Sequence, residues 1–88
     1  MATLRVSNRE QEALHELRQL VAARYPHASF NIVEGYDPPG KYLEVHLNAA
    51  DPDETFEEIL DTVMERLLFY QDQRDLDVYV MPVLESGA

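Results

Sequence analysis

The sequence predicts an α+β fold, a two-layer sandwich of order α-β-β-α-β in which both helices cover one face of an antiparallel or mixed sheet. Two segments carry apolar residues at helical spacing, and three segments alternate apolar and polar residues. Proline and glycine mark several of the turns between them. The 88 residues suffice for a single α+β domain over residues 1–88, with an ordered core expected over about residues 2–84.

The first helix is expected to begin after Ser7 and to end at Tyr25. Ser7 and Glu10 have the spacing of a capping box, in which each side chain binds the backbone N–H of the other residue. Pro26 disfavours helical geometry at Tyr25. Between these ends, apolar residues three and four positions apart form a predicted buried stripe: Ala13, Leu14, Leu17, Leu20 and Val21.

A β-hairpin is expected over residues 28–47. Apolar and polar residues alternate on both sides of residues 37–40, whose sequence Asp-Pro-Pro-Gly favours a turn. With these four residues as the loop, the register pairs apolar residues across the hairpin: Ile32 with Val45, and Phe30 with Leu47. One face of the hairpin is therefore predicted to be apolar.

A second helix is expected from Pro52 to about Asp72. Asp51 is the predicted N-cap, and Pro52 suits the first helical position. Apolar residues form a long stripe along this helix: Phe56, Ile59, Leu60, Val63, Leu67 and Tyr70. Three further apolar residues broaden it: Met64, Leu68 and Phe69. These three are predicted to lie in the core, and the alternative is a second, exposed apolar strip that covers a partner.

Two groups of polar residues on the helices are assigned no chemistry. Acidic residues are expected on the solvent side of the second helix: Glu54, Glu57, Glu58, Asp61 and Glu65. They are interpreted as a solvated face, and the alternative is a docking site for a basic partner. Glu12 and His15 form a single Glu-x-x-His pair, whereas a di-iron bundle needs two such pairs and further glutamates, so we expect an exposed helix face there.

The last strand is expected over residues 76–83. Pro82 cannot donate a backbone hydrogen bond, which predicts a strand at a sheet edge or a strand end. Residues 2–6 also alternate apolar and polar side chains. If they form a short N-terminal strand, the order becomes β-α-β-β-α-β, which is the ferredoxin-like arrangement. Without that strand the sheet has three strands, and the sequence leaves both arrangements open.

The α-β-β-α-β order resembles that of ribosome-binding factor A and related KH-like domains. This resemblance is one of architecture and matches no motif residue by residue. The chain has no GxxG clamp, and its basic residues are scattered, so the RNA binding of those domains is not carried over to it.

The charge balance disfavours nucleic acid and membrane surfaces as partners. Seventeen acidic residues against seven Lys and Arg give a net charge of −10. Binding of a phosphate backbone or an anionic bilayer requires clustered basic residues instead. The chain has no cysteine, which excludes disulfides, thiolate metal sites and cysteine nucleophiles. It has no signal-peptide pattern and no apolar run long enough to span a bilayer, so a cytoplasmic protein is expected.

The candidate functional residues share the face of the predicted sheet that the helices leave open: Asn31, Val33, Tyr42, Glu44, His46, Tyr79 and Met81. Tyrosine and methionine are enriched in protein interfaces and lysine is depleted there, which favours an association surface. The alternative is an ordinary solvated face. His46 and Glu44 have the spacing of an acid–base pair or of half a metal site.

The sequence therefore predicts a small acidic association module without catalysis. It would form a homodimer or dock on another protein through this face. The alternative is a small-molecule-binding or enzymatic domain whose pocket is formed by four of these residues: Tyr42, Glu44, His46 and Tyr79. No catalytic residue, metal ligand or cofactor is assigned.

Overall fold

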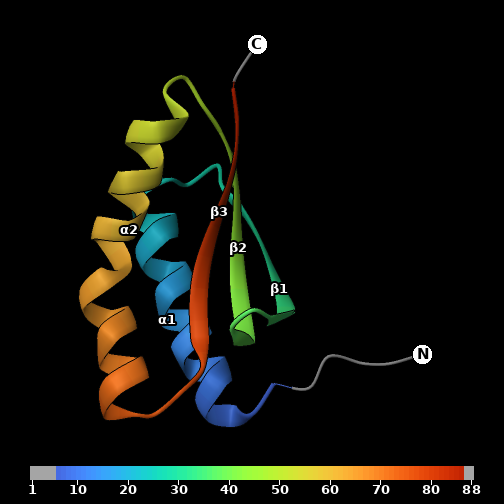
Figure 1. The fold of residues 1–88 in the computed structure, drawn as a ribbon. Helices are drawn as coiled ribbons and strands as arrows, with labels where there is room; N and C mark the ends of the chain where they lie inside the picture. Colours follow the sequence, from blue (N-terminus) through green and yellow to red (C-terminus); the bar gives the residue numbers. More distant parts are fainter. Residues whose placement is uncertain (1–5, 87–88) are drawn as a thin grey trace.

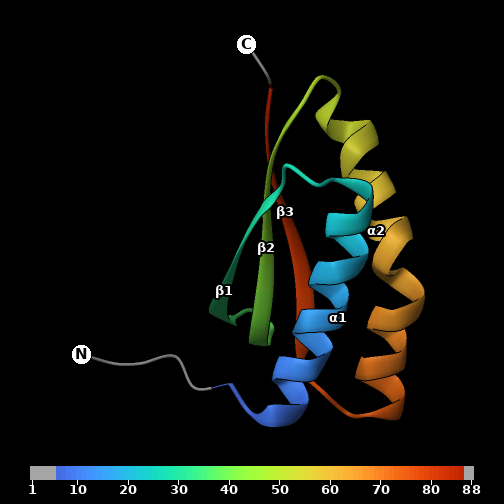
Figure 2. The same cartoon turned by 180° about the vertical axis from the view of Figure 1, so that it is seen from behind.

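The computed structural model describes residues 6–86 and confirms the α+β class. Two helices and three strands follow one another in the predicted order: α1 (Asn8–Arg24), β1 (Ser29–Tyr36), β2 (Pro39–Ala49), α2 (Pro52–Leu68) and β3 (Val78–Ser86). A π-helical segment, η1 (Phe69–Gln73), continues α2 directly, so the helical region ends close to the predicted position. Both helices lie side by side on one face of the sheet, and no helix of the described part of the chain covers the other face (Figures 1 and 2).

Local sequence signals set the ends of both helices. The Ser7 hydroxyl accepts a hydrogen bond from the Glu10 N–H, and the Glu10 carboxylate accepts one from the Ser7 N–H, so the capping box is confirmed. Asp51 caps α2 through the Glu54 N–H, and Pro52 lies in the first turn.

The sheet is mixed. Its strand order is β1-β2-β3, with β1 antiparallel to β2 and β2 parallel to β3. Both β1 and β3 are edge strands, which agrees with the prediction from Pro82. A ferredoxin-like topology is not confirmed, because the last strand pairs directly with β2. The predicted N-terminal strand lies outside the described residues except for Val6, which packs against the core and belongs to no strand.

The predicted hairpin register is wrong by two residues. Phe30 pairs with Val45 and Ile32 with Leu43, because the ladder continues as far as Tyr36 and Pro39. The loop between the paired residues is therefore Asp-Pro, at positions 37 and 38, rather than the four residues predicted. A shift of two positions leaves every side chain on its original face, so the predicted apolar face is retained.

The core lies between the helices and the inner face of the sheet. Its fully buried large side chains come from both helices and two strands: Leu14, Leu17, Val21, Leu43, Val45, Ile59, Val63 and Val78. Met64 and Leu68 are exposed on α2, so their prediction as core residues is wrong, whereas Phe69 packs against the core as predicted. Phe56, which belongs to the predicted apolar stripe, is also exposed. The buried stripe of α2 and η1 is narrower than predicted because α1 covers one flank of α2 and leaves the other to solvent (Figure 1).

A polar cluster joins the two helices. The guanidinium of Arg66 donates to both carboxylate oxygens of Glu16, at 2.5 and 3.1 Å, and the Tyr70 hydroxyl donates to the same carboxylate. At the other end of the pair, the Tyr25 hydroxyl donates to Glu58 at 2.5 Å. Glu58 is therefore engaged between the helices, whereas the other four acidic residues predicted on the solvent side of α2 are exposed. No helix within residues 6–86 is both long and apolar enough to cross a bilayer.

Candidate functional site

The seven candidate residues lie together on the face of the sheet opposite the helices, which we call the open face. Strand alternation places them there, because their neighbours Leu43, Val45 and Val78 are buried against the helices. The register arranges them in cross-strand rows: Val33, Tyr42 and Tyr79 in the first, Asn31, Glu44 and Met81 in the second, and His46 in the third between Ser29 and Val83. Although the predicted register is wrong by two residues, each of the seven residues lies on the face predicted for it.

Tyr42 and Tyr79 form an aromatic pair near the hairpin turn. Their ring centroids are 4.9 Å apart and the planes are tilted by 31°. The Tyr42 hydroxyl donates to the carbonyl oxygen of Pro38 at 2.7 Å. Burial of the hydroxyl raises the pKa of Tyr42, and the neighbouring Tyr79 raises it further. Although no helix covers it, Tyr42 is only 8% exposed.

Two glycines make this burial possible. A Cβ at Gly35 would overlap the Tyr42 ring, and a Cβ at Gly40 would lie 2.8 Å from Cε2 of Tyr79. The Tyr42 ring therefore packs against Gly35, and the edge of the Tyr79 ring lies close to Gly40. The role of Gly35 could not be predicted from the sequence, because its contact with Tyr42 depends on the register.

His46 and Glu44 form the polar part of the open face. His46 Nε2 lies 3.0 Å from Glu44 Oε1, within hydrogen-bond distance. The pair lies on one strand, two residues apart, so alternation alone brings the side chains together. No group of three or more His, Asp or Glu side chains within residues 6–86 could hold a metal ion. The geometry of this pair is that of a polar contact that keeps an imidazole in place beside a carboxylate.

A shallow hollow of about 250 Å³ lies beside His46. Residues from the ends of all three strands and the preceding loop line it: His27, Ser29, His46, Leu47, Asn48, Val83 and Glu85. Tyr42, Glu44 and Tyr79 are not part of this lining. Of the four residues of the predicted pocket, the hollow therefore includes His46 alone.

The open face carries few charges for so acidic a chain. Within the described strands, its formally charged side chains are Glu44, beside His46, and Glu85 at the end of β3. The acidic residues Glu57, Asp61 and Glu65 are exposed on the outer side of α2 instead. Met81 is 41% exposed in the middle row, with Tyr79 and Val83 before and after it on the same face. The central position of the face, in the middle row on β2, is Glu44, and the apolar side chains Tyr79, Met81 and Val83 follow one another along β3. The open face is thus apolar along β3 and carries few charges.

A second hollow, larger than the first, was not anticipated from the sequence. It has a volume of about 360 Å³ and lies between α1 and β1, on the helix side of the sheet. It arises because α1 packs over β2, β3 and α2 and leaves part of β1 uncovered. Glu12 and His15 lie on the exposed face of α1, as expected, and His15 contributes to the rim of this hollow. The sequence could not reveal it, because a helical stripe does not specify which strands lie beneath it.

Comparison with known proteins adds no identification. No protein-family model matches the chain, and neither a curated protein nor a solved structure shows significant similarity to it.

Proposed function

We propose that this protein is a non-catalytic association module that forms a homodimer through its open face. The observation that supports the proposal is a sheet face that no helix within residues 6–86 covers and on which the exposed Met81 lies between Tyr79 and Val83 along β3. Interface centres are typically apolar, aromatic- and methionine-rich and poor in charge.

Charge favours a second copy of the chain as the occupant. Each copy carries a net charge of −10, so two copies attract only through a surface that keeps most carboxylates apart. The open face meets this condition, since the acidic residues of α2 lie on the opposite side of the molecule. A two-fold axis across this face would also let Glu44 of one copy approach His46 of the other, which is the self-complementarity that a symmetric dimer requires.

The hollow beside His46 gives weaker support to a small-molecule site. Its volume of about 250 Å³ is smaller than the roughly 300–1,000 Å³ typical of ligand pockets. Of the four residues predicted to form such a pocket, Tyr42 and Tyr79 instead pack on glycine backbone. Association is therefore the function that the geometry supports best.

The test compares two methionines of matched exposure. Met81 on the open face is 41% exposed and Met64 on α2 is 40% exposed. Sedimentation equilibrium over a range of protein concentrations should give a dimer for the wild type and for Met64→Lys. Met81→Lys should be monomeric, because dimerisation would bury its ammonium group in an apolar interface. If the wild type is still monomeric at about 1 mM protein, its dimer dissociation constant is too high for a specific dimer, and the proposal is overturned. A dimer that Met81→Lys leaves intact would overturn it as well.

A further inference from the structure

The outer edge of β1 offers unpaired backbone groups. The Lys41 N–H donates to the Asp77 carbonyl at 2.8 Å, so Lys41 directs its backbone groups toward β3. Backbone groups of successive strand residues point to opposite edges, so Leu43 and Val45 also face β3 and make no ladder bonds to β1. Their partners in β1 are Ile32 and Phe30. The N–H and C=O groups of Phe30 and Ile32 therefore point away from the sheet, to an edge that no strand within residues 6–86 occupies.

The other edge of the sheet differs from this one. The same alternation directs the backbone of Tyr79 and Met81 toward β2 and that of Val80 and Pro82 outward. Pro82 has no N–H, so it removes a donor from the middle of the β3 edge, a common protection against strand pairing. β1 contains neither proline nor lysine, the residues that commonly protect an edge strand. Of the two edges, β1 is the one that remains open to a further strand.

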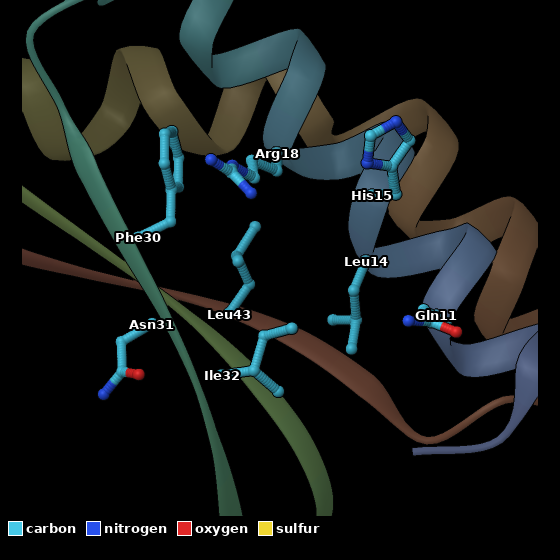
Figure 3. A pocket seen from close by; sticks show the side chains of 8 residues that line it. All are labelled: Gln11, Leu14, His15, Arg18, Phe30, Asn31, Ile32 and Leu43. Atoms are coloured by element: carbon cyan, nitrogen blue, oxygen red, sulfur yellow. The ribbon is translucent and has the colours of Figure 1, made fainter.

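The hollow of about 360 Å³ lies directly beside this edge. Figure 3 shows Leu14, Ile32 and Leu43 gathered between α1 and the strands, with Arg18 beside Phe30 and His15 on the helix above. Phe30 and Ile32 are only half-buried, because α1 does not cover them fully. A strand added to the edge would place every second side chain into this hollow.

The side chains that line the hollow favour a negatively charged group on its occupant. Among the described residues, no carboxylate lines the hollow, although the chain has 17 acidic residues. The Arg18 guanidinium lies 5.3 Å from the centre of the Phe30 ring and has no ion-pair partner among the described residues. It is thus available to a carboxylate on an incoming strand, at the Phe30 end of the hollow.

We infer that the β1 edge and the adjoining hollow form a binding site for an extended peptide segment of a partner protein. The segment adds to β1 as a fourth strand, inserts apolar side chains between α1 and β1, and presents a Glu or Asp side chain to Arg18. The segment can extend past the hollow at the Ile32 end, since the outward-facing positions of β1 continue there to Glu34 and Tyr36. This site lies at a sheet edge on the helix side and is separate from the open face of the proposed function.

The test uses a capped peptide, acetyl-Thr-Val-Thr-Val-Thr-Glu-amide, in which valine and glutamate share the groove-facing side. Titration into labelled full-length protein should shift the backbone amide resonances of Phe30 and Ile32 and protect these amides from hydrogen exchange. The Arg18→Glu variant should weaken binding about tenfold, the effect of losing one charge-assisted hydrogen bond. The matched control is Arg9→Glu, which makes the same charge change at an exposed residue of α1 outside the hollow, with no ion pair among the described residues, and should bind like the wild type.

Peptide controls separate backbone pairing from charge. N-methylation of the peptide at its edge-facing amides should abolish binding, and replacement of its glutamate with lysine should weaken binding as much as Arg18→Glu does. Amide resonance shifts that are confined to β3 or the open face would overturn the proposal. The absence of any amide shift at about 1 mM peptide would overturn it as well. Shifts at Phe30 and Ile32 that depend on protein concentration alone would assign the edge to a second copy and also overturn it. Met81→Lys should leave peptide binding unchanged. The peptide proposal and the dimer proposal can therefore be overturned separately.

Discussion

The ring of Tyr79 lies 4.9 Å from the ring of Tyr42, across two parallel strands and on a sheet face without a helix. The glycine backbone beneath the rings lets both side chains lie close to the sheet. Tyr42 is only 8% exposed, so Tyr79 and the exposed Met81 on β3 form most of the apolar surface at this end of the open face. The proposed interface therefore depends on contacts between these tyrosines and the hairpin glycines, and each contact can be tested by substitution.

Gly35→Ala should displace the Tyr42 ring, because the added Cβ would overlap it. We expect a loss of about 1–3 kcal/mol in the free energy of unfolding, typical of overpacking a tight contact. Chemical denaturation measures this loss. In a Tyr42→Ala background the same glycine change should cost much less, and an equal cost in both backgrounds would contradict the contact.

Glu16→Gln should destabilise the protein near neutral pH by about 1 kcal/mol, allowing for solvent screening of a partly exposed pair. The hydrogen bond from Arg66, with a second from Tyr70, holds the pKa of Glu16 below its ordinary value of 4.5. A group with a lowered pKa stabilises the fold fully above that ordinary value, and the stabilisation is lost as the pH falls through the folded-state value. The difference between Glu16→Gln and the wild type should therefore shrink in acid.

Urea denaturation at several pH values checks this dependence. Glu12→Gln is the matched control, since Glu12 is exposed one turn earlier on α1 and makes no hydrogen bond or ion pair within the described residues. A cost for Glu16→Gln that stayed constant from neutral pH into acid would contradict the assigned role of the carboxylate.

Ser7→Ala should lower the free energy of unfolding by about 1 kcal/mol, because it removes the side-chain acceptor for the Glu10 N–H. Ser7→Asp should retain most of the stability, since aspartate is an equally good N-cap and its charge suits the helix N-terminus. Thermal denaturation of the two variants beside the wild type makes the comparison. Equal stability of Ser7→Ala and the wild type would show that the cap contributes nothing.

Pro82→Val should make the β3 edge able to pair with other strands, because valine restores an outward N–H in the middle of that edge. We expect faster aggregation at high protein concentration, measured by light scattering during incubation. Leu84→Val is the control, since it changes an outward-facing position of the same strand without changing the number of donors. Equal aggregation rates in the two variants would show that Pro82 does not protect the β3 edge from strand pairing.

Much of the fold and the membership of the open face could be predicted from the sequence. Alternation in β2 and β3 was enough to put Tyr42, His46 and Tyr79 on one face, since an error of two residues in register does not change faces. The contacts of these side chains could not be predicted. The position of Tyr42 over Gly35 depends on the true register, in which the ladder continues to Tyr36 and Pro39.

The two helices, their caps, the three alternating strands and the acidic charge of the surface can all be predicted from the order of the residues. These follow from interactions between residues close in the chain and from the periods of helix and strand. The parallel pairing of β3 with β2, the ion pair between Glu16 and Arg66, and the exposure of Met64 on α2 arise only in the folded chain. The hollow beside β1 arises in the same way. These features depend on where one element lies relative to another, and a periodic pattern specifies which side of an element is apolar but not which neighbour covers it.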